Sequence, residues 1–112
     1  MDKLLEIKDA RSVAITANGS ASLTNVQKGL ANLILNVTES HADTTTVFTL
    51  QESADGSIWT DIKGVSLSVG VSDAGQYEIP FVVSKSQVRL SYAPAGTTKS
   101  VKFHAYLEPV FK

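Results

Sequence analysis

Short runs in which apolar and polar residues strictly alternate dominate this sequence. The clearest are VRLSY at 88–92 and VKFHAYL at 101–107. Successive side chains of a β-strand point to opposite faces of its sheet, so each run is expected to bury one face and expose the other. Helical spacing of apolar residues is weak along the chain. The pattern is typical of antiparallel sheets and predicts an all-β protein.

Turn-forming residues separate these runs. Clusters of Gly, Pro, Asn, Asp and Ser stand at 18–20, 53–56, 73–75 and 94–96, and these residue types suit the backbone angles of tight turns. Strands of about five to seven residues, joined by such turns, account for a single domain of this length. We therefore predict an antiparallel β-sandwich of about eight short strands, with a small barrel as the alternative.

A further alternating run stands near the N-terminus, and one later stretch is ambiguous. Val13 and Ile15 alternate with small and polar residues, which predicts a strand near 12–16. Apolar residues at 23–33 fall at near-helical spacing, but Asn and Gly within the stretch weaken a helix. A loop crossing the end of the sandwich fits that stretch equally well.

The segment TVFTLQESADGSIWTDIKG at 46–64 reads as a complete hairpin without a reactive group. In its second strand, Ile58 and Ile62 are expected to share the buried face, and Trp59 is expected on the other face.

The turn of this hairpin is closely specified. Ser53-Ala54-Asp55-Gly56 suits a type I turn followed by a glycine at positive φ. We therefore expect Asp55 and Gly56 to be required by the backbone of the turn and not by chemistry.

Composition removes several classes of function. The chain has no cysteine, which excludes disulfides and thiolate metal sites. The net charge of −1 divides into +1 for residues 1–38, −6 for residues 39–84 and +4 for residues 85–112. Neither sign is concentrated enough to indicate nucleic acid, and no apolar run is long enough to span a membrane. The charges are expected either to scatter over two sandwich faces or to help copies pack head to tail.

Two clusters of residues could carry chemistry. Glu39, His41 and Asp43 offer three potential metal ligands in one loop, but a structural zinc site needs four, and the other histidine, His104, is distant in sequence. Paired carboxylates near the hairpin tip, at 52–61, would sit on a convex surface, and no G-x-S-x-G elbow occurs. We predict no catalytic residue, no metal and no cofactor, so the protein is not expected to be an enzyme.

Two aromatic residues, Trp59 and Tyr106, lie opposite the main apolar faces of their strands. Aromatic side chains in such positions serve as platforms for ligands or as anchors of interfaces. Both residues are therefore candidates for a ligand platform.

Other features favour assembly. Residues 1–9 are expected to form an arm that lies on its own sheet edge or on a neighbour's, ahead of a sandwich domain at 10–112. Two apolar runs near 80 and 109 each contain a proline, which favours edge strands or strand ends. The residues expected at a subunit interface are Leu4, Leu5, Ile7, Pro80, Phe81, Pro109 and Phe111.

The segments FTLQESADGSIWTDIKG and QVRLSYAPAGTTKSVKFHAYLEP carry a resemblance that spans about residues 45–108. A strand ending L-Q-E-S, a D-G-S turn, W-T-D and a later R-L-S-Y before a G-T turn resemble small virion proteins of tailed bacteriophages. Within that group the chain is most similar to head decoration proteins, also called cement or stapling proteins.

This resemblance implies a jelly-roll-like sandwich that binds and stabilises the outer surface of a phage capsid. The expected partners are the major capsid protein and further copies of the chain, in a dimer or trimer, on a virion assembled after synthesis in the bacterial cytoplasm. The alternative is a carbohydrate- or receptor-binding module of a phage tail or baseplate, using Trp59 or Tyr106.

Overall fold

The computed structural model describes residues 4–110. The strands are β1 (Leu5–Asp9), β2 (Gly19–Leu23), β3 (Gly29–Ser40), β4 (Thr45–Ser53), β5 (Thr60–Val69), β6 (Gly75–Val83), β7 (Gln87–Ala95) and β8 (Val101–Pro109), and a single 3₁₀ turn, η1 (Val71–Asp73), joins β5 to β6.

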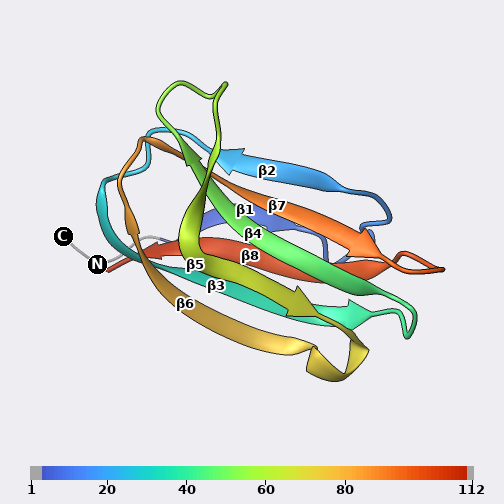
Figure 1. Cartoon of the computed structure of the whole chain (residues 1–112). Coiled ribbons are helices and arrows are strands. Elements are labelled where there is room, and N and C mark those ends of the chain that lie inside the picture. The colour runs from blue at the N-terminus through green and yellow to red at the C-terminus, as the bar shows by residue number, and fades with distance from the viewer. Residues whose placement is uncertain (1–3, 111–112) are drawn as a thin grey trace.

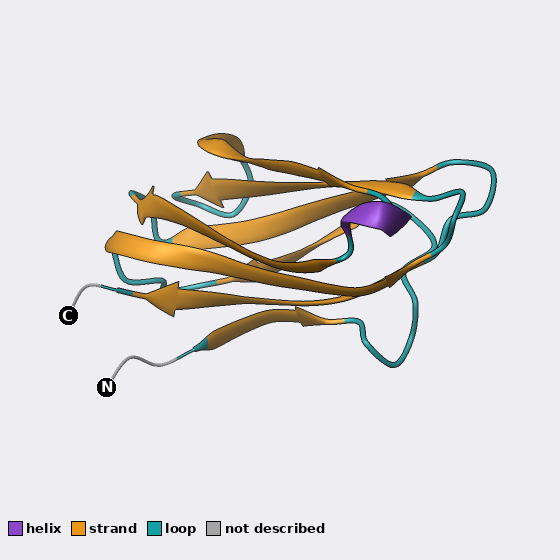
Figure 2. Ribbon diagram, turned by 90° about the horizontal axis from the view of Figure 1, so that it is seen from below, coloured by secondary structure: helices purple, strands orange, loops and turns teal. Residues whose placement is uncertain are grey.

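The strands form two four-stranded sheets that face each other (Figure 1), in the orders β1-β8-β3-β6 and β2-β7-β4-β5. All of their ladders are antiparallel. Consecutive strands alternate between the sheets, except β4 and β5, and η1 carries the chain from one sheet back to the other (Figure 2). This strand order is that of the jelly roll, so the predicted fold class is confirmed.

The core lies between the inner faces of the sheets. Phe48 and Phe103, one from each sheet, pack edge to face with ring centroids 4.9 Å apart, and Tyr92 lies 5.4 Å from Phe103. In the alternating runs of β7 and β8 every apolar residue of the pattern is buried, as predicted: Val88, Leu90, Tyr92, Val101, Phe103, Ala105 and Leu107.

Neither the alternating run at 12–16 nor the ambiguous stretch at 23–33 is helical: the first is a loop, and the second ends β2 at Leu23, forms a loop and begins β3 at Gly29. Residues 12–16 form no strand, so that prediction was wrong: Ile15 makes an isolated bridge to Val101, and Val13 is 76% exposed. The reason is that this segment crosses from β1 in one sheet to β2 in the other. Residues 24–28 form the loop between β2 and β3, where Asn25 has a φ of 56° and Val26 is buried.

The loop of the β4–β5 hairpin has the predicted glycine at positive φ. Gly56 has a φ of 83°, and Asp55 Oδ1 accepts the backbone N–H groups of Ser57 and Ile58 at 2.9 and 3.1 Å. The expected burial of Ile58 was wrong, because β5 begins only at Thr60 and Ile58, in the loop, is 74% exposed.

The segment predicted as an arm supplies β1, which pairs with β8 at the edge of its own sheet. The division of the chain at residue 9 stays a prediction. Pro80 lies in the edge strand β6 and Pro109 is the last residue of β8, so both prolines stand where the sequence placed them. Among residues 4–110, no helix is long and apolar enough to span a membrane.

Candidate functional site

The two predicted platform residues lie on the outer faces of different sheets. Tyr106 belongs to β8 of the first sheet, and Trp59 directly precedes β5 of the second. The sandwich core separates them, so the structure gives two separate surfaces and not one combined platform.

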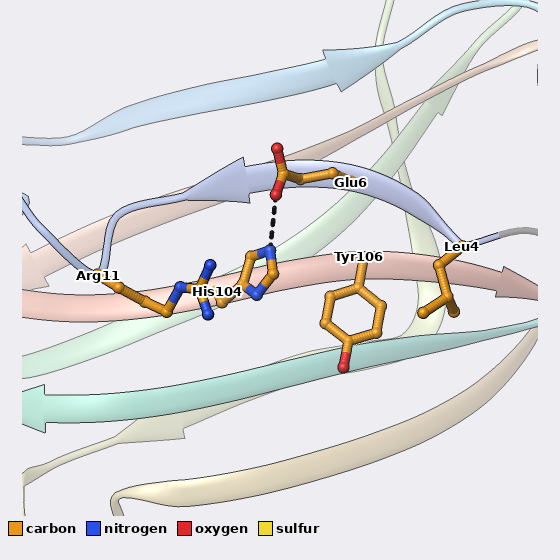
Figure 3. Close-up of a pocket in the computed structure, with 5 residues that line it drawn as sticks. All are labelled: Leu4, Glu6, Arg11, His104 and Tyr106. Atoms are coloured by element: carbon orange, nitrogen blue, oxygen red, sulfur yellow. Dashed lines mark hydrogen bonds and ion pairs between the residues drawn. The ribbon is translucent and has the colours of Figure 1, made fainter.

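A groove of about 360 Å³ runs over the outer surface of β1 and β8, lined by Leu4, Glu6, Arg11, His104 and Tyr106. Figure 3 shows Tyr106 between Leu4 and His104, with Arg11 beyond His104. The rings of His104 and Tyr106 have centroids 5.0 Å apart and are tilted by 55°. Together they form an aromatic floor that is half-buried.

A β-bulge in β1 assembles the polar wall of the groove. The register shifts between Glu6 and Lys8, so that Glu6 stands opposite Tyr106 and Asp9 stands opposite His104. Residues 6 and 9 of a regular strand would point to opposite faces, whereas the extra residue of a bulge brings both to one face. Glu6 Oε2 lies 2.8 Å from His104 Nε2 (Figure 3).

Arg11 fixes the far end of the wall. Its Nε and Nη2 each donate to a different carboxylate oxygen of Asp9 at 2.8 Å. This side-chain pairing, helped by the backbone N–H of Arg11, lowers the pKa of Asp9 far below its usual range and raises the pKa of Arg11. Asp9 is therefore ionised, and each of its two oxygens accepts a hydrogen bond from Arg11.

Tyr106 is next to the neighbouring strand β3 in the ladder. Ile34 of β3 stands directly opposite it in the ladder and is 6% exposed, although it lies on the outer face. Figure 3 shows the tyrosine ring extending toward β3. The Tyr106 hydroxyl makes no hydrogen bond within residues 4–110, so it is free to donate or accept. Asn36, opposite His104, adds an amide next to the rings.

Among residues 4–110, potential metal ligands gather at this groove and not in the loop of Glu39, His41 and Asp43. Atoms of Glu6, Asp9 and His104 lie within 4.8 Å of one another, but Arg11 already occupies Asp9. In the loop, His41 Nδ1 accepts the backbone N–H of Asp43 at 3.1 Å, which is a local turn contact.

The predicted interface residues separate into two groups. Ile7 and Phe81 are 8% and 6% exposed and belong to the core, so each offers little surface to a neighbouring subunit. Four others keep surface exposure, at both edges of one sheet and at the end of β8: Leu4, Leu5, Pro80 and Pro109. Phe111 lies outside the described residues. A contact role for the four exposed residues stays a prediction.

Sequence reasoning missed Glu6, Asp9 and Arg11 as site residues. The alternating pattern predicts faces only for regular strands, and these three residues surround a bulge and the loop that follows it. No local sequence signal marks this bulge.

Comparisons with known proteins add little. No protein-family model and no curated protein matches the chain. Among solved structures, the chain is similar to a chitosan-binding module of a chitosanase/glucanase from Paenibacillus sp. IK-5, with 15% identity, a TM-score of 0.48, and 95% of this chain and 93% of that one covered. A carbohydrate-binding module specific for non-crystalline cellulose has 6% identity, a TM-score of 0.40, and coverages of 92% and 69%. Likeness at this level transfers no function, which has to be argued from the residues of this chain.

Proposed function

We propose that the protein is a non-catalytic carbohydrate-binding module whose site is the groove over β1 and β8. The observation that carries this proposal is the aromatic floor of His104 and Tyr106 beside the polar wall of Glu6 and Arg11. Ligand sites of this composition combine apolar area with a few placed polar groups that fix orientation.

The groove matches the chemistry of a sugar ring. One face of a pyranose exposes mainly C–H groups, which pack on the Tyr106 ring, and its equatorial hydroxyls need donors and acceptors at the rim. Glu6 accepts, and the Tyr106 hydroxyl does both. Because Arg11 is already paired with Asp9, it offers little net positive charge, which favours a neutral saccharide.

Isothermal titration of the full chain with neutral oligosaccharides tests this proposal. Suitable probes are cello-, xylo-, manno- and chito-oligomers. We expect one class to bind, and Tyr106→Ala to weaken that binding about tenfold, the effect of about 1.4 kcal/mol. Tyr106→Phe keeps the ring and is expected to lose less, because only the hydroxyl is removed.

Lys102→Ala is the matched control, since Lys102 lies on the same strand as Tyr106 and does not line the groove. Equal affinities of wild type and Tyr106→Ala for the bound oligomer would exclude the groove as the site. Failure of every oligomer to bind would reject the binding of neutral saccharides. Capsid binding, with its expected capsid and homo-oligomer partners, stays a prediction that emptied phage heads would test.

A further inference from the structure

The outer face of the β2-β7-β4-β5 sheet carries two polar rows that cross all four strands. Their members are adjacent in the ladders, as Ser20–Ser91–Thr49–Ser66 and Ser22–Arg89–Gln51–Asp61. A register irregularity between β4 and β5 places Asp61 opposite Gln51 and Ser66 opposite Thr49. The outer face of this sheet therefore carries hydroxyl, guanidinium, amide and carboxylate groups.

Arg89 is the fixed centre of the second row. Its guanidinium carbon lies 4.4 Å from the centroid of the Trp59 ring, and its Nε donates to Gln51 Oε1 at 2.7 Å. Gln51 in turn donates to Asp61 Oδ1 at 2.7 Å, and the Trp59 Nε1–H donates to the carbonyl of Gly56 at 3.1 Å. The arginine is thus held at one face and at one nitrogen.

The two terminal amino groups of Arg89 have no hydrogen-bond partner among residues 4–110. A guanidinium with two free N–H groups in its plane binds a carboxylate through two parallel hydrogen bonds. Because Trp59 and Gln51 already orient this side chain, little conformational entropy remains to be lost on binding. Ser22 and Ser91 flank the arginine and supply hydroxyls that both donate and accept.

We propose that this face is a second binding site, which takes a saccharide carrying one carboxylate. The carboxylate binds the terminal amino groups of Arg89, and the hydroxyls of the sugar bind Ser22 and Ser91. Toward β5 the row ends in Asp61, which accepts sugar hydroxyls.

The charge of the row selects the class of ligand. Asp61 lies two strands from Arg89, about 10 Å at the usual strand spacing, and would repel a second anionic group placed there. A polyanion such as single-stranded nucleic acid needs several cations along its path, whereas these two rows contain a single one. One acidic sugar next to neutral sugars fits that pattern.

This proposal is independent of the groove and has its own reporter, because Trp59 is the single tryptophan of the chain. We would titrate the Tyr106→Ala variant, so that the groove contributes little, and follow both tryptophan emission and heat. The probes are xylotriose bearing one glucuronate, neutral xylotetraose, and trigalacturonate.

We expect the glucuronate probe to bind with a saturating change in emission, and both other probes to bind about tenfold more weakly. Arg89→Lys keeps the charge but removes the planar fork, so it is expected to lose about tenfold as well. Groove binding by Arg89→Lys in the otherwise wild-type chain, or an unchanged thermal midpoint, shows that this variant is folded.

Three results would overturn the site: equal affinity for the glucuronate and neutral probes, an unchanged affinity in the Arg89→Lys variant, or no binding of the glucuronate probe. The last result would mean that Arg89 and Trp59 only stabilise the sheet. Tighter binding of trigalacturonate would instead indicate a polyanion surface and reject the single-carboxylate ligand.

Discussion

The two outer faces of the sandwich treat an aromatic residue in opposite ways. On the β1-β8-β3-β6 face, Tyr106 lies in a groove and its hydroxyl has no partner in the described chain. On the β2-β7-β4-β5 face, Arg89 covers the Trp59 ring and the indole N–H is bound to Gly56. Exposure of an aromatic residue therefore does not define its role, because the neighbouring strands decide whether its ring or its cation partner is left open at the surface.

Both faces depend on an irregular strand. The bulge in β1 brings Glu6 and Asp9 to one face, and the irregularity in β5 does the same for Asp61 and Ser66. The two residues of each pair differ by an odd number of positions, and in a regular strand such residues would point to opposite faces. Both proposed sites therefore lie where the regular strand pattern is interrupted.

The largest expected effect is a loss of stability caused by a substitution in the core, which both sheets share. Phe103→Ala removes a fully buried ring that contacts Phe48 and Tyr92 between the sheets. We expect a loss of about 3–5 kcal/mol in the free energy of unfolding, measured by urea titration. Tyr106→Ala, on the outer side of the same strand, should cost much less. A loss below about 1 kcal/mol for Phe103→Ala would contradict the shared core.

A smaller loss of stability is expected for substitutions at two glycines of the β4–β5 hairpin. Gly56 and Gly64 have φ angles of 83° and 85°, so alanine at either position is expected to cost about 1–2 kcal/mol. A Cβ at Gly56 would lie 3.0 Å from the flexible end of Gln87, and one at Gly64 would meet nothing within 4 Å. Similar losses are therefore expected in thermal unfolding.

Tryptophan emission distinguishes the two glycine variants. The Gly56 carbonyl accepts the indole N–H of Trp59, so Gly56→Ala is expected to shift the emission, and Gly64→Ala is expected to leave it unchanged. Neither variant should alter groove binding on the other sheet. A shift of the same size in both would mean that the turn does not position Trp59.

The difference between regular and irregular segments also explains how far the sequence could predict this molecule. Alternation in β7 and β8 predicted the fold because regular strands obey a period of two. The turn at Asp55 and Gly56 was predictable since its residue types have a local conformational reason. The groove was not predictable, because Glu6 and His104 are ninety-eight positions apart in the sequence and come together only through a bulge. The sequence indicated Tyr106 and Trp59 as single residues, but not their neighbours His104 and Arg89, which make the two surfaces different.

The smallest expected effect is a pH dependence of the thermal midpoint, compared between Asp9 and Asp55, one carboxylate near each face. Hydrogen bonds from the backbone N–H groups of Ser57 and Ile58, and from the Ser53 hydroxyl, lower the pKa of Asp55, and Arg11 lowers the pKa of Asp9. A lowered folded-state pKa contributes stability above the unfolded value of about 3.9, and this stability is lost as pH falls through the folded pKa. The advantage in thermal midpoint of wild type over Asp9→Asn or Asp55→Asn should therefore be present near neutral pH and shrink in acid.

Ionic strength is expected to affect the stability that these two carboxylates contribute in different ways. The Asp9–Arg11 pair is an exposed ion pair, so the advantage of wild type over Asp9→Asn should decrease at high ionic strength. Asp55 is bound by neutral donors, so the advantage over Asp55→Asn should change little with salt. Asp43→Asn is the control, because the Asp43 carboxylate accepts no hydrogen bond within residues 4–110. Equal salt sensitivity of the Asp9 and Asp55 variants would show that net charge, and not the partner of each carboxylate, sets their contribution.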